Sequence, residues 1–463
     1  MTSLAWPIAA GMAGETLLGL VDARLVGGLG PAALGGVGVA TTLMYLNYSL
    51  VFGFMRGVKV RTAFAVGEGR PADGISCAQA GLIIGAIVGV VVAIIGRDIS
   101  PLLRLLGIAP ELVAPARDFF GAVTWGAPAT CMLTALIQHR QGLGDTRSPM
   151  IVGLAGNVVN ALLGYALIYG HAGLPALGVR GGGLATATTE YLELFTMAWL
   201  LARDAREARG ARLGLTGALR EVKDLGLPTG MQFGLENIAF TTFTVILGGI
   251  AATEIAAHHI ALTIIRTSFL PGIAIGEAAS VLVGQSLGAR KLDEADRVFV
   301  ASLKVGIGFM AACGVVFALF GSRIAASFTA DPVVRATASR LLLVAAVFQV
   351  LDAVNLVTRG ALRGAKDVRV PAIIGIAVVW TCIPSAAFFL GKVAGLGALG
   401  GWFGFLGETT LAATFFTLRW KYGSWRRPYE EPPRDNPAET AGSPRPADST
   451  APRSAPPPDA RAA

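Results

Sequence analysis

Charged residues are scarce in this chain. Asp, Glu, Lys and Arg make up 15% of its 463 residues, whereas hydrophobic residues make up 53%. An ordinary soluble domain carries about 25% charged residues, and the mean hydropathy here is +0.61. The shortage of charge therefore excludes a soluble globular domain and indicates an integral membrane protein.

Cysteine and histidine are rarer still, with four of each. His258 and His259 are adjacent and would point about 100° apart on a helix. No third ligand is apparent, so we predict no metal site and expect both residues at the membrane interface. The four cysteines form no CxxC pair, and we expect small core residues rather than a disulfide framework: Cys77, Cys131, Cys313 and Cys382.

Catalytic signatures are missing as well. The chain has no HExxH motif and no nucleophile paired with a base, which argues against an intramembrane hydrolase. It has no GxxxxGK[ST] loop, which argues against ATP as a direct energy source. We expect no enzymatic activity and no organic cofactor.

Long apolar stretches, by contrast, are abundant. They run for about 20 to 30 residues without alternating polarity, as helices that cross about 30 Å of hydrocarbon require. We predict an all-α membrane protein with twelve transmembrane helices, near residues 3–26, 33–55, 74–96, 112–138, 149–170, 181–201, 222–250, 255–283, 297–320, 333–358, 369–391 and 397–419.

The sequence repeats itself once, at a spacing of 221 to 222 residues. Matching positions include Pro7 and Pro228, Glu15 and Glu236, Thr42 and Thr263, Gly67 and Gly288, and, after a one-residue slip, Asp145 and Asp367. Six predicted spans fall in each copy. Two such halves are typical of transporters, in which two pseudo-symmetric bundles enclose a shared cavity. We predict an N-lobe over 1–210 with a cytoplasmic linker, a C-lobe over 211–420, and a disordered Pro-rich cytoplasmic tail over 421–463.

The net charge of +8 is a topology signal. With both termini placed in the cytoplasm, the cytoplasmic connections carry about 19 Lys and Arg and the opposite side about 7. The linker between spans six and seven is especially basic: Arg203, Arg206, Arg209, Arg212, Arg220 and Lys223. Arg56, Lys59 and Arg61 close the second span, and we expect them to reach lipid headgroups. We predict contact with membrane lipid and none with nucleic acid.

Several motifs resemble those of one transporter family. The opening stretch carries Pro7, then Val21-Asp22, then Val26-Gly27-Gly28-Leu29-Gly30. The second half carries LPTGMQFGLENIAF at 227–240, VLVGQSLGARKLDEA at 281–295 and FQVLDAVNLVTRGALRGAKDVRVP at 348–371. In order, spacing and duplication they resemble the MATE (multidrug and toxic compound extrusion) transporters of the MOP flippase superfamily, with features of both NorM-like and DinF-like members. The resemblance spans residues 4 to 420 and implies the MATE fold.

Acidic residues inside spans are energetically costly and therefore usually functional. Glu15 and Asp22 lie seven residues apart and share a helix face, and Pro7 introduces a kink on the same helix. The resemblance implies that Pro7 and Asp22 couple a cation to helix bending. It also implies that Asn160 and Thr186 surround Asp22. Archaeal relatives place an Asp four residues after the Asn, where this chain has Gly164, so a proton on Asp22 is a better expectation than sodium.

The second half offers a parallel set. Glu236 and Asp352 match the two acidic positions of NorM-type relatives, which bind a cation there. Two carboxylates brought together from distant helices bind a cation or share a proton, because both cannot stay ionised and bare. Pro228 precedes Glu236 by eight residues, as Pro7 precedes Glu15. Glu277 aligns with Arg56 in the repeat, which allows an electrostatic contact between the lobes.

The resemblance implies a secondary active multidrug or xenobiotic exporter that works by alternating access. A cation, with a proton expected and sodium the alternative, would enter from outside as the cargo leaves. The expected cargo is small, amphipathic and cationic, and we expect a monomer in a bacterial inner membrane. The rival interpretation is a flippase for lipid-linked oligosaccharides. Such flippases often have 14 spans and a cavity rich in Arg and Lys, whereas this chain has twelve predicted spans with carboxylates inside them.

Overall fold

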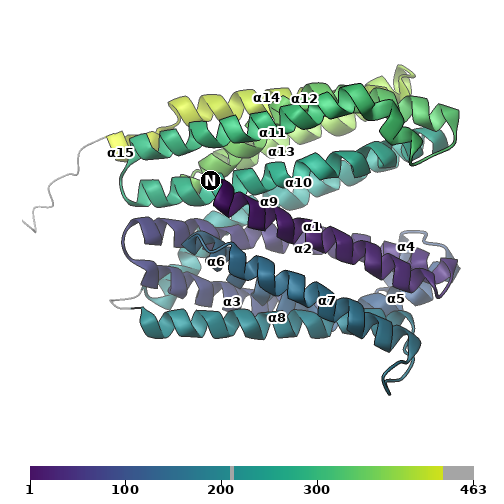
Figure 1. Ribbon diagram of the computed structural model, residues 1–463, viewed down its shortest axis with the longest axis horizontal. Coiled ribbons are helices and arrows are strands. Elements are labelled where there is room, and N and C mark those ends of the chain that lie inside the picture. Colours follow the sequence, from purple (N-terminus) through teal and green to yellow (C-terminus); the bar gives the residue numbers. More distant parts are fainter. Residues whose placement is uncertain (209–212, 431–463) are drawn as a thin grey trace, which may run out of the picture.

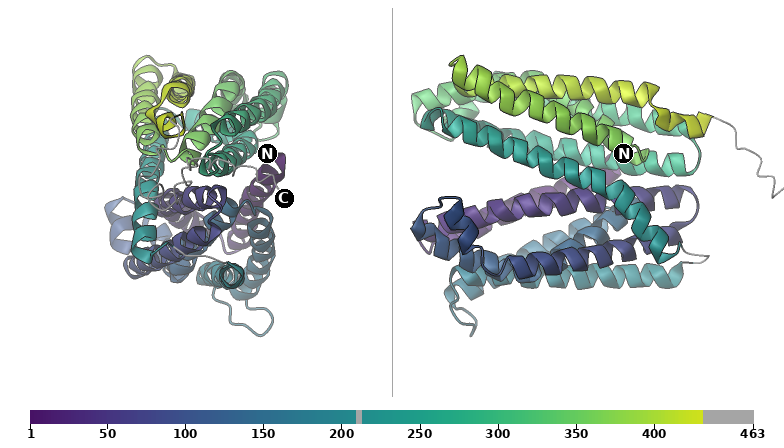
Figure 2. Two further views of the ribbon diagram at one scale, coloured as in Figure 1. Left: turned by 90° about the vertical axis from the view of Figure 1, so that its left-hand side faces the viewer. Right: turned by 180° about the vertical axis from the view of Figure 1, so that it is seen from behind.

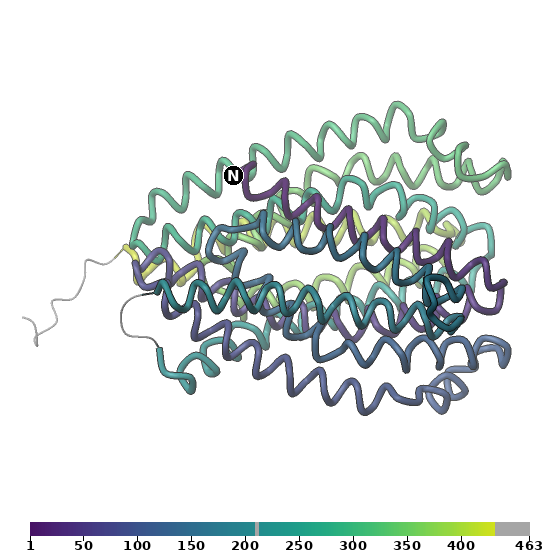
Figure 3. The backbone as a smooth tube through the Cα atoms, turned by 60° about the horizontal axis from the view of Figure 1, so that its bottom comes forward, coloured from purple at the N-terminus to yellow at the C-terminus, as the bar shows by residue number. Residues whose placement is uncertain are grey.

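The computed structural model describes residues 1–208 and 213–430, and this part of the chain contains helices and connecting turns but no strand. Nine of its helices are both long enough and apolar enough to cross a membrane. The helices α8 (Val179–Glu207), α9 (Leu215–Gly248) and α14 (Gly397–Tyr422) are of similar length but fall outside that set. All the long helices run roughly along the long axis of the molecule (Figures 1 and 3).

The N-terminal half provides six long segments. They are α1 (Thr2–Gly27), α2 (Pro31–Gly67), α3 (Pro71–Ile95), the broken pair α5 (Pro110–Val123) and α6 (Ala127–Leu143), α7 (Arg147–Tyr169) and α8, with a short α4 (Ser100–Leu105) before α5. A 3-10 turn at Thr124–Gly126 joins α5 to α6. Proline stands at the first position of α2, α3 and α5, where its missing N–H leaves no bond unmade.

The C-terminal half provides six more. They are α9, α10 (Ala252–Gly288), α11 (Leu292–Ala326), α12 (Pro332–Gly364), α13 (Arg369–Ala386) and α14, followed by α15 (Arg427–Glu430). The helix of α13 continues as a π-helical stretch over Ala387–Val393. Asp331 caps α12 by accepting hydrogen bonds from the backbone N–H groups of Val333 and Val334. Nine of the twelve predicted spans lie within one of these segments, and the other three, 74–96, 149–170 and 222–250, run one or two residues past the end of theirs. The predicted helix count and order are therefore confirmed.

The two halves pack their helices in the same way. In the N-terminal half α1 packs on α7, α3 on α6, and α7 on α8; in the C-terminal half the corresponding pairs are α9 on α13, α11 on α12, and α13 on α14. Figure 1 shows the halves as two layers, with α1 to α8 below and most of α9 to α14 above. The predicted pseudo-symmetric pair of six-helix lobes is therefore the observed architecture.

The first helix of each half crosses from one lobe to the other. At the start of α9, Ala218 and Val222 belong to an N-lobe core cluster that also contains Met55. At the start of α1, Ala5 belongs to a C-lobe cluster with Ile275 and neighbouring residues. Figure 2 shows α9 passing from the upper half into the lower one. The boundary predicted near residue 210 agrees with the repeat in the sequence. In the structure, however, the first helix of each half packs partly against the opposite lobe.

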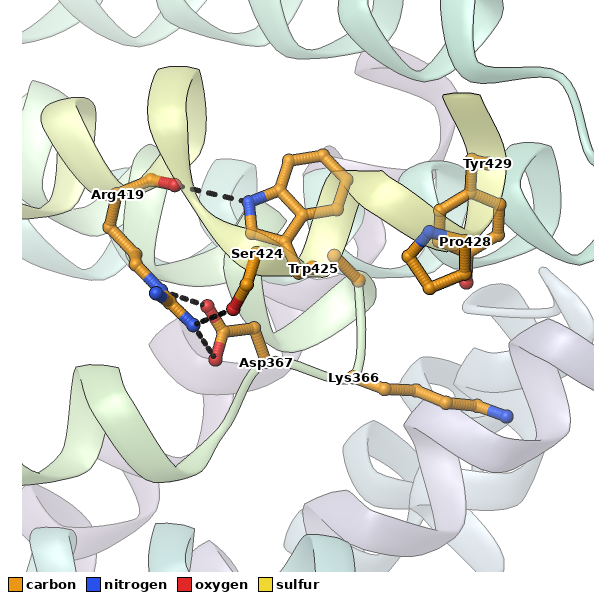
Figure 4. Close-up of a pocket in the computed structure, with 8 residues that line it drawn as sticks. Lys366, Asp367, Arg419, Ser424, Trp425, Pro428 and Tyr429 are labelled. Carbon is orange, nitrogen blue, oxygen red and sulfur yellow. Dashed lines mark hydrogen bonds and ion pairs between the residues drawn. The ribbon is translucent and has the colours of Figure 1, made fainter. Parts of the chain in front are cut away.

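The predicted disordered tail begins too early. Trp425 is buried, its ring lies 4.5 Å from that of Trp420 between centroids, and its Nε1 donates a hydrogen bond of 3.1 Å to the Arg419 carbonyl. Arg419 in turn binds Asp367 at 2.7 Å (Figure 4). Burial of an indole outweighs the polar composition around it, so residues 421–430 are ordered. The rest of the predicted tail, 431–463, lies outside the described residues.

Candidate functional site

The C-lobe site contains a carboxylate of α9, Glu236, that is paired with the guanidinium group of Arg359. Glu236 is buried, and its Oε1 accepts hydrogen bonds from Gln232 Nε2 at 2.8 Å and from Arg359 Nη1 at 2.9 Å. Gln232 lies one helical turn before Glu236, so both face the same way. Gly375 of α13 makes room for the pair, since a Cβ there would lie 2.9 Å from Glu236 Oε1. Glu236 is thus already ion-paired.

Two more buried carboxylates share this arginine. Asp352 lies two helical turns before Arg359 on α12, and Glu408 lies on α14, near Asn355 of α12. Arg359 interacts electrostatically with Glu236, Glu408 and Asp352. Within the described residues Asp352 makes no hydrogen bond or ion pair. Three carboxylates around one guanidinium leave an excess of negative charge whenever all are ionised, so the cluster suits a proton or another small cation.

Of the four residues in this cluster, sequence reasoning identified Glu236 and Asp352 and missed Arg359 and Glu408. Glu236 and Asp352 both interact with Arg359, and no direct contact between the two carboxylates occurs among the described residues. Arg359 stands seven residues after Asp352, a spacing that places both on one helix face. Glu408 occupies the repeat position of Thr186. The seven-residue spacing and the repeat position can both be read from the sequence, but neither shows which carboxylate Arg359 contacts.

The N-lobe site is only partly assembled. Asn160 of α7 is buried and donates a hydrogen bond of 3.3 Å from Nδ2 to Thr186 Oγ1 of α8, so the predicted pair is present. Asp22 of α1 is half-buried, and among the described residues it has no hydrogen bond or ion pair. Asp22 lies five residues before Gly27, the end of α1, which is about 7.5 Å along the helix axis. The predicted hydrogen bonds from Asp22 to Asn160 and Thr186 are therefore absent in this conformation.

Gly164 marks an open position beside this pair. A Cβ there would lie 3.5 Å from Leu25 Cδ1 on α1 and 3.9 Å from Asn160 Oδ1, which are ordinary contact distances. The position thus lies between α1 and the Asn160 side chain. It is sterically free to carry the Asp that archaeal relatives have.

Glu15 lies near acidic residues of α8 to which sequence reasoning gave no role. It lies at the middle of α1 and interacts electrostatically with Glu193 of α8. Glu190, one turn earlier on α8, accepts a hydrogen bond from Thr130 Oγ1 at 2.5 Å. Gly156 of α7 leaves the space that the Glu193 carboxylate fills, because a Cβ there would clash with it. The N-lobe therefore also gathers carboxylates around its first helix.

Pro7 and Pro228 both lie inside continuous helices, α1 and α9, as predicted. Pro7 is buried and Pro228 half-buried. A proline within a helix removes one backbone hydrogen bond and weakens the helix locally. Each proline lies close to the segment at which its helix passes from one lobe to the other.

Several predicted surface positions are buried instead. Arg56, Lys59 and Arg61 are 1–3% exposed and make ion pairs inside the protein, so they do not reach headgroups. His258 is 1% exposed and accepts a hydrogen bond of 3.1 Å on Nδ1 from Trp402 Nε1, so the interfacial placement is wrong for it. Local hydropathy does not reveal partners on distant helices. No group of three metal-binding side chains occurs in the described part of the chain.

Two small hollows of the described surface lie apart from the carboxylate site. One, of about 280 Å³, is lined by Lys366 and Asp367 between α12 and α13 and by Trp425 of the C-terminal segment (Figure 4). The other, of about 210 Å³, is apolar and lies where α2, α3 and α9 meet, beside Phe54 and Met231. Neither hollow reaches the buried carboxylates of α9, α12 and α14.

A duplicated bundle of twelve membrane helices, with carboxylates buried in both halves, defines the class of two-lobed membrane transporters. The MatE family model matches residues 7–166 and 228–388. The chain therefore belongs to the MatE family, and it is a multi-pass protein of the bacterial inner membrane.

Relatives and solved structures agree with this assignment. The chain is 31% identical to a probable multidrug resistance protein NorM of Xanthomonas campestris pv. campestris, over 91% of this chain and 93% of that one. It is 28% identical to a multidrug resistance protein MdtK of Yersinia enterocolitica, over 90% and 94%. A MOP superfamily transporter from Pyrococcus furiosus and the eukaryotic MATE transporter AtDTX14 share its fold, each with a TM-score of 0.82 and with 22% and 17% identity over 92% of this chain and 96% of theirs.

Proposed function

We propose that this protein is a secondary active exporter of small organic molecules, driven by the inward movement of a cation. Relatives that align over nearly the whole chain are named for multidrug resistance, which supports export of varied compounds. The observation that carries the proposal is the C-lobe cluster, in which Arg359 forms an ion pair with Glu236 and the buried Asp352 and Glu408 interact with it electrostatically. A transporter needs such a group, whose charge changes when the coupling ion arrives.

The coupling ion is a proton in this proposal. Glu236 is neutralised by Arg359, so the cation acts on Asp352 and Glu408. Protonation of either one removes a negative charge beside Arg359 and changes how strongly the arginine holds α9 to α12. One elementary charge crossing 100 mV releases about 2.3 kcal/mol, and about 1.4 kcal/mol already supports a tenfold concentration ratio. The available energy is therefore sufficient.

The N-lobe contributes a second proton site in this scheme. Asp22 has no hydrogen-bond or ion-pair partner among the described residues, and Asn160 and Thr186 are hydrogen-bonded to each other. A proton on Asp22 makes its carboxyl group a donor as well as an acceptor, so it can join that amide and hydroxyl when α1 bends at Pro7. Small amphipathic cations are the expected cargo, because a site that releases protons is attractive to another positive group.

Transport in proteoliposomes tests the proposal. A fluorescent organic cation is loaded, and proton and sodium gradients are imposed separately. We expect efflux that follows the pH gradient and is indifferent to sodium. Dependence on sodium alone would overturn the proton assignment, and absence of efflux under both gradients would overturn the exporter proposal. Transbilayer movement of a labelled lipid-linked oligosaccharide, without dye efflux, would instead favour the flippase.

A further inference from the structure

Four charged side chains meet where the two lobes touch. Glu277 of α10 binds Arg56 Nη2 of α2 at 2.6 Å through Oε1, and binds Lys59 Nζ of α2 through Oε2. Arg363 of α12 binds the same carboxylate at 3.2 Å. Arg56 also lies 4.0 Å above the ring centroid of Phe233 on α9. One carboxylate of the C-lobe thus holds two cations of the N-lobe.

This cluster is fully enclosed and carries an excess of positive charge. The four side chains are 2% to 8% exposed. Three cations surround a single carboxylate, and Nε and Nη1 of Arg56 and Nη1 of Arg363 have no hydrogen-bond partner. Removing one partner from a buried ionic group leaves uncompensated charge, which is strongly unfavourable. Glu277 is the only acid found bound to these three cations among the described residues, so their proximity depends on it.

The internal repeat explains why opposite charges meet here. Arg56 and Glu277 are repeat equivalents, at a spacing of 221 residues. Gly67 and Gly288 are equivalents too, and they also touch, since a Cβ on Gly288 would lie 3.1 Å from Gly67 Cα. Residues next to a two-fold axis meet their own counterparts. Identical charges at such positions would repel each other, whereas Arg opposite Glu attracts.

The cluster lies at the end of the molecule where the lobes are in contact. Every residue of α2 from Met55 to Ala65 is buried, whereas much of its first half is not. Close backbone approaches fall in the same region: a Cβ on Gly57 would lie 2.6 Å from the Val222 carbonyl oxygen. Ion pairs between the halves in the described part of the chain come from α2 residues 56–61 alone. The basic linker marks this end as cytoplasmic.

We propose that Glu277 is the latch of a cytoplasmic gate. It holds Arg56 and Lys59 of the N-lobe against Arg363 of the C-lobe and so closes the cytoplasmic end. The inward-open state requires these contacts to separate. Without the Glu277 charge, the cations of the two lobes repel each other and the gate opens. The inference extends the proposed exporter function, but its test follows the conformation and needs neither cargo nor an ion gradient.

Distance measurements between spin labels test the latch. Arg70 and Lys291 are exposed repeat equivalents just beyond α2 and α10, and labels replace both in a cysteine-free background. We expect Glu277→Gln to lengthen the dominant distance and to lower the closed population roughly tenfold, as coupling energies of this kind do. Asp367→Asn is the matched control, because it removes a buried carboxylate from an ion pair, with Arg419, that lies entirely within the C-lobe. We expect its distribution to equal that of the unchanged protein.

A charge swap provides the second variant. The pair Arg56→Glu with Glu277→Arg keeps the number of charges and their positions on the pseudo-two-fold axis, and we expect it to restore the short distance. If Glu277→Gln does not reach the membrane as folded protein, the swap decides alone: a closed distribution supports the latch and an open one overturns it. An unchanged distribution in Glu277→Gln, or an equal shift in Asp367→Asn, also overturns it.

Discussion

At the scale of single residues, the C-lobe chemistry depends on how one arginine is shared. Arg359 forms an ion pair with Glu236 and acts electrostatically on Asp352 and Glu408. The two acids predicted from sequence therefore have different roles in the structure. Glu236 compensates a buried cation, whereas Asp352 has no direct partner in the described residues. Substitutions at the two positions should separate stability from transport.

We expect Glu236→Gln and Asp352→Asn each to reduce proton-driven efflux to less than about a tenth of the original rate. Glu236→Gln should also lower stability, by at most about 3–5 kcal/mol, because Arg359 loses its direct ion pair and keeps only the attraction of Asp352 and Glu408. Asp352→Asn should cost much less, since no bond is lost. Efflux from proteoliposomes and thermal unfolding in detergent measure the two effects. Asp293→Asn, at an exposed position on α11, is the control, and gradient-driven efflux at the original rate in either variant would contradict the coupling role.

Gly164 offers a test of ion selectivity in the N-lobe. A Cβ at this position meets only ordinary contacts, so Gly164→Asp should fold. It places a second carboxylate between α1 and Asn160, and hard oxygen ligands suit a metal cation. We expect efflux in this variant to gain at least about twofold stimulation by sodium. Gly164→Ala adds the Cβ without the charge and should gain none; equal sodium responses in the two variants would rule out this account of selectivity.

At the scale of helices, prolines stand where α1 and α9 pass between the lobes. Alanine lacks the ring that disrupts a helix interior, where proline costs about 3 kcal/mol. We therefore expect Pro7→Ala and Pro228→Ala to leave thermal stability unchanged or raised while turnover falls several-fold. Pro332→Ala, at the first position of α12, is the control because proline there produces no kink. A loss of stability in parallel with turnover would indicate a packing role and not a hinge.

At the scale of the whole molecule, six spans in each half place both termini on one side of the membrane. The positive-inside distribution predicts that this side is the cytoplasm. Cysteines introduced at Ala172 and Ala330, exposed between α7 and α8 and between α11 and α12, should react with an impermeant maleimide added to intact cells. A cysteine at Arg70 should react only after permeabilisation. The opposite pattern would reverse the orientation and move the latch to the outer side.

The sequence by itself determined the membrane setting, the twelve helices and the two-fold repeat. These features depend on composition and on apolar runs long enough to span the bilayer, which are local properties of the chain. Which acids have partners was decided by tertiary structure. Arg359 reaches Glu236 across 123 positions, and Lys59 reaches Glu277 across 218. Hydropathy considers each helix in lipid alone, so it predicted that Lys59 lies at the membrane surface. In the structure the opposite lobe packs against Lys59 and buries it.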